Sequence, residues 1–198
     1  MTEDIEAIFE KSGALLKGHF LLASGLHSPV YWEKALVLQY PEYTEKLCGM
    51  IADHYRNHGI QVVAGPTTPG IILAYETARQ LGVRGIFAEK DPSEKDGGRV
   101  FRRGFSIEPG EQVLIVDDIF STGGSVRDVI QAVDKLGGNI VGVGVLVDRT
   151  TEKVDLGVPF YSCHKTEVIT YKPEDCPLCR EGMPLTVRGS SRKSPGQP

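Results

Sequence analysis

The feature that most constrains the fold is a regular alternation of short Val- and Ile-rich runs with longer amphipathic segments between residues 41 and 147. Short apolar runs are typical of buried strands, and segments of about 10 to 15 residues with helical periodicity are typical of the connecting helices. Such alternation predicts an α/β fold: a central, mostly parallel sheet flanked by helices, with ligands at the carboxyl ends of the strands. The expected order is helix 41–58, strand 61–64, helix 69–81, strand 84–88, strand 113–117, helix 125–136 and strand 139–147.

The first forty residues follow a different pattern. Apolar residues at helical spacing predict an amphipathic helix over residues 3–17 that ends near Gly18. Two strand-like stretches follow at residues 20–23 and 30–38, separated by turn-forming residues. They predict a hairpin that lies outside the main sheet. We call this part, together with the end of the chain, the predicted hood.

The length of 198 residues fits one domain of ordinary size. A basic, glycine-containing stretch between two expected strands predicts a mobile flap, and the last ten residues have no apolar side chain to anchor them. We therefore expect a single domain over residues 1–188, with a hood at about 1–40 and 150–188, a core at about 41–149, a flap at about 90–103 and a disordered tail at 189–198.

The composition argues against several classes of partner. A formal net charge of -4 lacks the basic footprint of a nucleic-acid-binding protein. No apolar run approaches the roughly 20 residues that span a bilayer, and the acidic start lacks the basic region of a signal peptide. Four unevenly spaced cysteines do not form a secreted disulfide framework. We expect a cytoplasmic protein with reduced thiols, no nucleic-acid partner and no membrane partner.

One segment combines a buried strand, two adjacent carboxylates and a small-residue loop that opens onto a helix. Its sequence from 113 to 125 is VLIVDDIFSTGGS. A helix N-terminus presents unpaired amides and a partial positive charge, and glycines let the backbone close around a phosphate. The loop therefore predicts a monophosphate cradle, with the hydroxyls of Thr122 and Ser125 as further donors. Asp117 and Asp118 suit ribose hydroxyls or a divalent metal.

The alternative interpretation of this segment is an ordinary strand, a capped turn and a helix. The segment 113–125 is not a Walker A loop, because no G-K-[ST] follows, and it is not a G-x-G-x-x-G dinucleotide turn. The segment resembles the ribose-phosphate signature of the type I phosphoribosyltransferase family. That resemblance implies the substrate 5-phosphoribosyl-1-pyrophosphate, a variable hood, a flexible loop and Mg²⁺.

Other segments resemble one branch of this family, the orotate phosphoribosyltransferases. A glycine-bounded hairpin followed by Tyr31 and Trp32 resembles their start, and Leu146-Val-Asp-Arg149 resembles a strand end whose arginine binds the orotate carboxylate. The Cys-Pro-Leu-Cys stretch at 176–179 resembles the tail of bacterial members. Orotate is a planar anion that needs a stacking wall and a fixed cation. The alternatives are core packing for the aromatic pair and a surface salt bridge for Arg149.

The sequence departs from many family members at two lysine positions. Ala23 stands in place of a lysine beside the orotate site, and Thr67-Thr68-Pro69-Gly70 replaces an aromatic-lysine pair in the pyrophosphate loop. We therefore expect Lys90, Arg102 and Arg103 of the flap to supply most of the charge that neutralises pyrophosphate.

The resemblance implies a pentosyltransferase that transfers phosphoribosyl from 5-phosphoribosyl-1-pyrophosphate to orotate, giving orotidine 5'-monophosphate and pyrophosphate in pyrimidine (UMP) biosynthesis. A homodimer is expected, because family members lend the flap of one subunit to the neighbour's site. The expected catalytic residues are Asp117, Asp118, Lys90 and Arg103, with the two aspartates holding Mg²⁺ indirectly through the substrate. The expected contacts are Thr67, Thr68, Lys90, Arg102, Arg103, Asp117, Asp118, Ser121, Thr122, Gly123, Gly124 and Ser125 for phosphoribosyl pyrophosphate, and Tyr31, Trp32, Ser121 and Arg149 for orotate.

Two other functions fit the same segment. A purine phosphoribosyltransferase would share the loop at 113–125 and differ in the hood and at residue 149. A non-catalytic regulator would keep the fold to sense phosphoribosyl pyrophosphate. The acidic balance and the presence of both the aspartate pair and the basic flap argue against a regulator.

The cysteine pair near the end of the chain has two interpretations. Cys176 and Cys179 are either free thiols in a turn or half of a zinc site, with Cys163 and His164 as the other half. Two histidines of the hood, at positions 19 and 27, are placed for substrate contact or for capping the hairpin.

Overall fold

The computed structural model describes residues 5–22, 24–93, 98–151, 154–167 and 169–188. The chain divides into two compact units. Unit 1 combines Met1–Val37 with Glu167–Pro198, and unit 2 is Leu38–Thr166.

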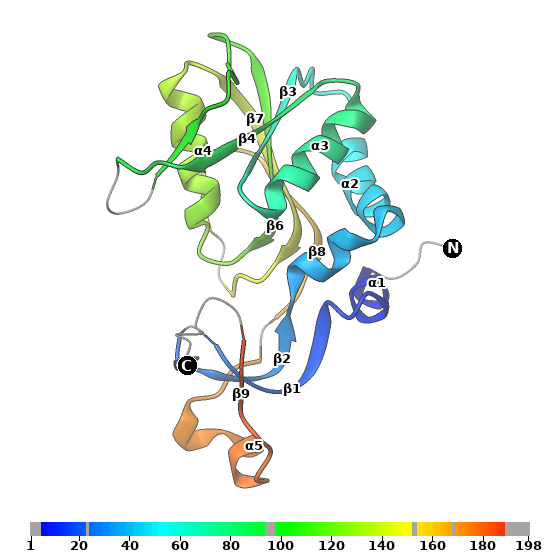
Figure 1. Ribbon diagram of the computed structural model, residues 1–198, viewed down its shortest axis with the longest axis vertical. Coiled ribbons are helices and arrows are strands. Elements are labelled where there is room, and N and C mark those ends of the chain that lie inside the picture. Colours follow the sequence, from blue (N-terminus) through cyan, green and yellow to red (C-terminus); the bar gives the residue numbers. More distant parts are fainter. Residues whose placement is uncertain (1–4, 23, 94–97, 152–153, 168, 189–198) are drawn as a thin grey trace, which may run out of the picture. The chain divides into compact units, whose positions relative to one another are not determined.

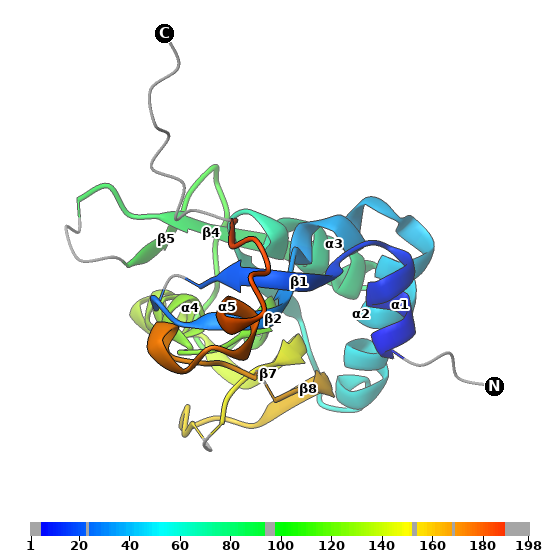
Figure 2. The same ribbon diagram turned by 90° about the horizontal axis from the view of Figure 1, so that it is seen from below.

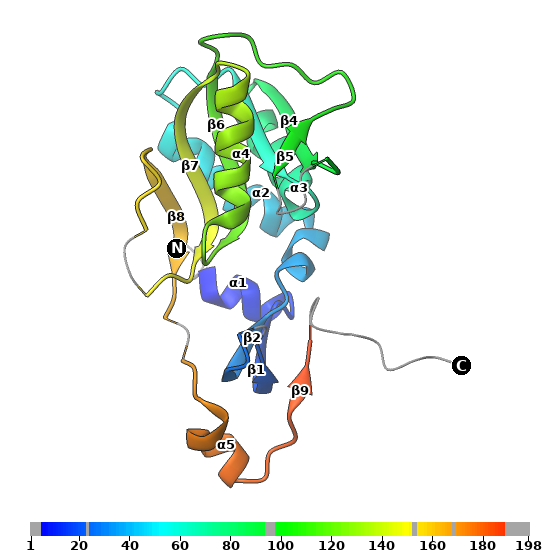
Figure 3. The same cartoon turned by 90° about the vertical axis from the view of Figure 1, so that its left-hand side faces the viewer.

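Unit 2 is built on a six-stranded sheet with the order β5-β4-β3-β6-β7-β8. Neighbouring strands are parallel except for β4 and β5, which form an antiparallel hairpin. Helices α2 and α3 cover one face of the sheet and α4 covers the other (Figures 1 and 3). The strands are β3 (Val62–Pro66), β4 (Arg84–Lys90), β5 (Arg99–Phe101), β6 (Gln112–Phe120), β7 (Asn139–Asp148) and β8 (Phe160–Lys165), and the helices are α2 (Pro41–Tyr55), α3 (Pro69–Leu81) and α4 (Gly124–Lys135).

The buried strands explain why this sheet is central. All five residues of β3 are buried, and so are the residues of β6 from Val113 to Asp118. Strands that are buried on both faces carry continuous apolar runs, as this sequence does. Residues at both ends of α3 explain where this helix begins and ends. Pro69 occupies the first turn of α3, and Gly82 closes it with φ 72°, a left-handed conformation that favours glycine.

The α/β fold with a mostly parallel sheet is confirmed, and helix 69–81 has the expected bounds. Strand β4 runs on to Lys90, two residues beyond the expected end, and β6 runs on to Phe120. Strand β8 pairs with β7 and extends the main sheet, so residues 150–166 belong to unit 2, although the sequence analysis assigned them to the hood.

Unit 1 contains a separate three-stranded sheet with the order β2-β1-β9. Strands β1 and β2 form an antiparallel hairpin and run side by side in Figure 2, which confirms the hairpin outside the main sheet. The two-residue strand β9 adds to β1 in parallel. Its elements are α1 (Ile5–Lys11), β1 (Leu15–Leu21), β2 (His27–Trp32), the 3-10 helix η2 (Pro173–Asp175), α5 (Pro177–Arg180) and β9 (Thr186–Val187); a further 3-10 helix, η1 (Lys34–Gln39), runs across the boundary between the units.

Two expected elements of this region were wrong. The expected helix 3–17 ends at Lys11, because Gly13 takes a left-handed φ of 71° and Leu15 and Leu16 pair in β1. The expected strand 30–38 ends at Trp32, and its last residues form a 3-10 helix. In both cases the apolar residues fit either period. Pairing in the hairpin decided the first case, and a local 3-10 turn replaced the end of the strand in the second.

Three predictions fall wholly or partly outside the described residues. These are the disordered tail at 189–198, the flap positions 94–97, and the lysine replacement at residue 23. Among the described helices, none has the length and apolar character needed to cross a membrane.

Candidate active site

The carboxyl ends of four neighbouring strands gather many of the expected site residues. Thr67 and Thr68 follow β3, Lys90 ends β4, Ser121 follows β6 and Arg149 follows β7. Parallel strands that adjoin in a sheet end at the same edge, so tertiary pairing brings together residues that lie far apart in sequence.

Asp117 and Asp118 are buried near the end of β6, with exposed fractions of 4% and 2%. The Asp117 carboxylate accepts hydrogen bonds from the Asp118 amide at 2.9 Å and from the Ser125 hydroxyl at 2.6 Å. The Asp118 carboxylate accepts a hydrogen bond from the Ile119 amide at 2.6 Å. Buried carboxylates need such partners, and the Ser125 bond ties the acidic pair to the start of α4.

The loop from Ser121 to Ser125 forms the N-terminal end of α4. Gly123 occupies the N-cap position with φ 77°, and no side-chain hydrogen bond caps the helix there. A Cβ atom at Gly123 would lie 2.8 Å from the Phe120 ring and 2.9 Å from the Arg127 guanidinium. Only glycine therefore fits. The uncapped first turn and the partial positive charge of the helix end favour an anion at this position.

Arg99 lies at this edge of the sheet and was not among the residues expected to contact substrate. Its guanidinium donates to the Thr67 hydroxyl at 3.1 Å, to the Thr67 carbonyl at 3.3 Å and to the Ala88 carbonyl at 3.0 Å. Burial lowers the pKa of Arg99, and the charge of Asp117 partly opposes that shift. In the sequence, Arg99 is one of several basic residues of the expected flap. The pairing of β5 with β4 places Arg99 next to Thr67.

The other flap cations have different surroundings. Lys90 is exposed at the end of β4, directly opposite Arg99 in the hairpin. Arg102 and Arg103 are exposed and follow β5, which runs antiparallel to β4 and so leads away from that strand end. Arg103 donates to the Glu89 carboxylate at 2.8 Å and thereby lowers the pKa of Glu89.

Arg149 lies beside the end of β6, because its amide donates to the Phe120 carbonyl at 2.8 Å. A cavity of about 560 Å³ adjoins the same strand ends and is lined in part by Phe120, Asp148 and Lys165. It contains none of the expected contacts, but Phe120 directly precedes Ser121 and Asp148 directly precedes Arg149.

Tyr31 and Trp32 belong to unit 1. Trp32 is 5% exposed, and its ring packs edge-on against Phe9 with centroids 4.9 Å apart. Tyr31 is partly buried and its ring lies 5.6 Å from that of Phe20. The packing of Trp32 is that of a core residue, the alternative that the sequence left open for it.

Comparison with known proteins shows the family of this chain. Residues 37–178 match the family model described as phosphoribosyl transferase domain. An orotate phosphoribosyltransferase of Pelotomaculum thermopropionicum is 55% identical over 97% of this chain and 100% of its own length. The chain belongs to the orotate phosphoribosyltransferase family.

Further relatives extend this comparison. An orotate phosphoribosyltransferase of Desulforamulus reducens is 50% identical over 95% of this chain and 96% of its own length. The crystal structure of orotate phosphoribosyltransferase from Aeropyrum pernix superposes with a TM-score of 0.65 at 24% identity, over 82% of this chain and 93% of that one. That structural likeness supports the fold of the orotate phosphoribosyltransferase family, and the sequence relatives support membership in it.

Proposed function

We propose that this protein transfers the phosphoribosyl group of 5-phosphoribosyl-1-pyrophosphate to orotate. In the reaction, the bond from the ribose C1 carbon to the pyrophosphate oxygen breaks and its electron pair leaves on pyrophosphate. A bond from an orotate ring nitrogen to C1 forms, and the proton of that nitrogen passes to solvent. The observation that carries the proposal is the buried acidic pair joined to an uncapped, glycine-bounded helix start at the carboxyl end of β6.

The loop after β6 would bind the 5'-phosphate of the sugar. Its amides at Gly124 and Ser125 lie in the uncapped first turn of α4, where an anion is favoured. A Cβ atom at Gly124 would meet only the Thr122 hydroxyl, at 3.9 Å, so the backbone there is open to a close ligand. Asp117 holds the Ser125 hydroxyl in place.

The acidic pair would position the ribose. The Asp118 carboxylate is close enough in sequence to the loop to accept bonds from ribose hydroxyls when the phosphate is bound. Asp117 is occupied on both oxygens by Asp118 and Ser125. Asp118 is therefore the better candidate for direct contact with the sugar, and Asp117 for positioning.

The pyrophosphate would lie near Thr67, Thr68 and the flap cations. Arg99 anchors the Thr67 backbone and adds positive charge there, and exposed Lys90 is placed opposite it. Positive charge stabilises the negative charge that develops on departing pyrophosphate. Arg102 and Arg103 remain proposed contacts, and use of Arg103 requires that it leave Glu89.

The donor set fits Mg²⁺ held through the substrate. Carboxylate oxygens are the ligands that Mg²⁺ prefers, but the two aspartates are already hydrogen-bonded to amides and a hydroxyl. They are too few for an all-protein cage, so pyrophosphate and ribose oxygens would supply most ligands. When bound, Mg²⁺ would neutralise charge on the leaving group.

Orotate would be recognised through Arg149, with Ser121 as a further contact. An arginine suits a carboxylate because its planar fork donates two parallel hydrogen bonds. The family relatives that carry the name orotate phosphoribosyltransferase support orotate over a purine. We also propose that the flap at about 90–103 closes over the substrates and that the protein is a homodimer that shares this flap. Its proposed location is the cytoplasm.

The test measures the loss of orotate absorbance after addition of phosphoribosyl pyrophosphate and Mg²⁺, with adenine, hypoxanthine, xanthine and uracil as parallel acceptors. We expect turnover of orotate alone. Turnover of a purine would overturn the base assignment and keep the phosphate loop. Binding of phosphoribosyl pyrophosphate without turnover of any base would favour the regulator.

A further inference from the structure

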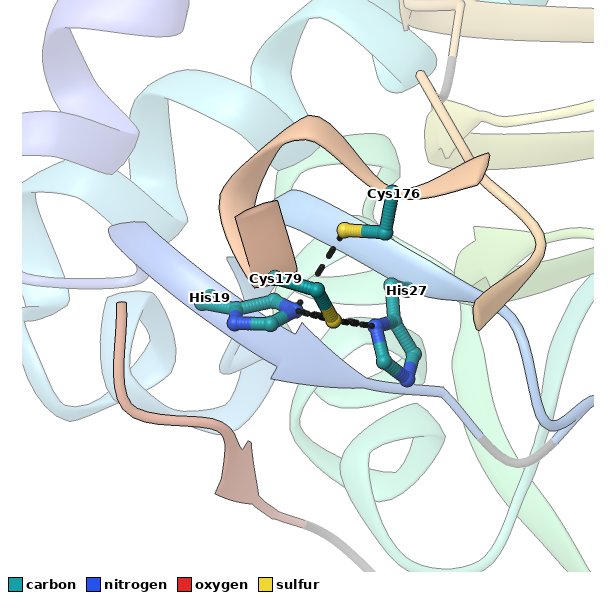
Figure 4. Close-up of side chains that lie close together, drawn as sticks. All are labelled: His19, His27, Cys176 and Cys179. Atoms are coloured by element: carbon teal, nitrogen blue, oxygen red, sulfur yellow. Dashed lines mark hydrogen bonds between the residues drawn. The ribbon is translucent and has the colours of Figure 1, made fainter. Parts of the chain in front are cut away.

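Four metal-binding side chains from distant parts of unit 1 converge on one point. His19 extends from β1 and His27 from β2, while Cys176 is the N-cap residue of α5 and Cys179 lies within α5; Figure 4 shows the four side chains together. One ligand atom from each residue lies within 4.8 Å of all the others. The two cysteines therefore have these histidines as neighbours, and not Cys163 and His164, which lie in β8 of unit 2.

The sulfur-to-nitrogen distances of the cluster are close to those of tetrahedral zinc coordination. His19 Nε2 and His27 Nδ1 are 2.9 Å apart. The sulfur-to-nitrogen distances are 3.5 Å for Cys176 to His19, 3.7 Å for Cys179 to His19 and 3.3 Å for Cys179 to His27. Zinc bonds of about 2.0 to 2.1 Å to nitrogen and about 2.3 Å to sulfur set tetrahedral edges of roughly 3.5 to 3.6 Å between nitrogen and sulfur and roughly 3.3 to 3.4 Å between two nitrogens. The sulfur-to-nitrogen distances fit these edges, and the two nitrogens would move apart by roughly 0.4 Å to bind zinc.

Hydrogen-bond chemistry alone does not account for the convergence. His19 Nδ1 lies 2.8 Å from the Met183 carbonyl, so this nitrogen carries the proton and Nε2 presents its single lone pair. Three groups approach that lone pair: His27 Nδ1, the Cys176 sulfur and the Cys179 sulfur. A single lone pair accepts one hydrogen bond with good geometry, so it does not satisfy three neighbours. A cation at the centre would be bound by all four groups, and the Met183 carbonyl would orient His19 as outer-shell partners of zinc ligands do.

Three of the four side chains are buried although the surrounding chain has little core, and Cys179 is exposed. His19, His27 and Cys176 are exposed by 2%, 5% and 1%. Among the described residues from Glu167 to Arg188, Cys176 alone is buried. Apolar burial therefore contributes little to holding this segment against the hairpin. Small elements without a sufficient core are commonly held by disulfides or structural metals.

We propose that His19, His27, Cys176 and Cys179 bind a structural Zn²⁺ that fastens the segment 167–188 to the β1–β2 hairpin. Two thiolates and two neutral imidazoles form a closed set of four ligands, which is typical of structural zinc and leaves no position for a substrate. Both cysteines are free in the structure. A Cys176–Cys179 disulfide is the competing state, and it would remove two of the four ligands.

The first experiment measures metal content in the full chain, purified under reducing conditions without a polyhistidine tag. We expect about one zinc ion per chain by mass spectrometry. After removal of zinc, titration with Co²⁺ should give visible ligand-field bands of tetrahedral cobalt and a near-ultraviolet thiolate-to-cobalt band. A wild-type protein that neither contains nor takes up either metal would overturn the proposal, as would two thiols missing from a denatured thiol count.

Matched variants locate the metal. Cys179→Ser and His27→Asn should each lose most of the zinc, whereas Cys163→Ser and His58→Asn, which change the same residue types outside the cluster, should keep it. Should a cluster variant fail to fold, the cobalt spectrum of the wild type still decides whether thiolates bind the metal. Zinc retained at wild-type levels in both cluster variants would place it elsewhere and overturn the assignment.

Limited proteolysis tests the fastening role. Arg180 and Arg188 are exposed trypsin sites on the segment, whereas Lys172 precedes Pro173 and resists trypsin. A chelator should accelerate cleavage at these sites at least about tenfold and leave cleavage of unit 2 unchanged, because local opening governs proteolysis. Cleavage that a chelator does not change in a zinc-containing protein would contradict the fastening role.

Discussion

The interior of unit 1 and the interior of unit 2 are stabilised by different kinds of contact. In unit 2, β3 and the middle of β6 are entirely buried, and a continuous apolar core joins them to α4. In unit 1, several buried residues are polar, among them Ser12, His19, His27 and Ser28. Its second segment has Cys176 as the one buried position in the described range 167–188.

This difference predicts how each unit responds to mutation and to metal or redox conditions. Unit 2 derives its stability from apolar burial and can leave polar groups uncapped at the strand ends, where the proposed phosphate site lies. Unit 1 has an apolar core around Phe9 and Trp32, but its second segment has little apolar burial. If the proposed zinc site holds that segment, the integrity of unit 1 should respond to metal and redox conditions that leave unit 2 unchanged. Four variants sharpen or break this comparison.

Leu114→Ala should have the largest effect. Leu114 is fully buried in β6, and its truncation should lower the free energy of unfolding of unit 2 by about 3 kcal/mol. Circular dichroism during urea unfolding would measure this loss. Trp32 is the one tryptophan of the chain and lies in unit 1, so its fluorescence reports that unit separately.

A chelator should shift the Trp32 fluorescence transition and leave the circular dichroism transition of unit 2 in place. Leu136→Ala, at a leucine that is 41% exposed, is the control and should cost less than about 0.5 kcal/mol. Coincident transitions under every condition would show that the units unfold as one, and the comparison would fail.

Gly123→Ala should lower kcat/KM by about 100-fold, the size of effect seen when backbone donors to a developing anion are lost. The new Cβ would clash with Phe120 and Arg127 in a left-handed backbone. Gly137→Ala has the same φ of 77° but meets Pro109 at an ordinary 3.5 Å, so it should lose stability and keep activity. Equal activity losses in the two variants would mean that backbone strain, and not the phosphate loop, is responsible.

Arg99→Ala should raise KM for phosphoribosyl pyrophosphate about tenfold, because loss of one charge-assisted contact costs about 1.5 kcal/mol. The loss also frees the Thr67 backbone. Arg103→Ala removes a guanidinium whose side chain is 64% exposed and paired with Glu89, and should change KM less. Steady-state kinetics at constant ionic strength would decide; a larger effect at Arg103 would favour the sequence-based choice of residues.

Glu76→Gln should have the smallest effect, about 0.5 kcal/mol at neutral pH, as is usual for surface ion pairs. Hydrogen bonds from Arg79 lower the pKa of Glu76 in the folded state, with Gln80 as a further donor. A lowered folded pKa means that the stabilisation is present above the ordinary carboxyl pKa and is lost as pH falls through the folded value.

The stability difference between wild type and Glu76→Gln should therefore vanish in acid. Glu10→Gln in unit 1 removes the more exposed pair with Lys17 and should show no measurable change. A difference for Glu76→Gln that persists at low pH would indicate a packing effect.

The predictions succeeded where the controlling chemistry is local. Helix 69–81 has proline at its start and glycine after its end, and both act within one turn. The loop after β6 could be proposed as a site from the sequence because its carboxylates, glycines and hydroxyls are contiguous. The helix expected at 3–17 failed because Leu15 and Leu16 satisfy their backbone groups by pairing with β2, which no local pattern reveals.

The sequence by itself determined the α/β class of the core and the family to which the chain belongs, and it carried the prediction of an acidic pair beside a phosphate loop, because each resides in a contiguous pattern. Only the tertiary structure decided which flap cation reaches Thr67, that β8 completes the main sheet, and that His19 and His27 meet Cys176 and Cys179. These outcomes depend on strand register and on contacts between segments more than 150 residues apart, where one residue of slip turns a side chain to the opposite face.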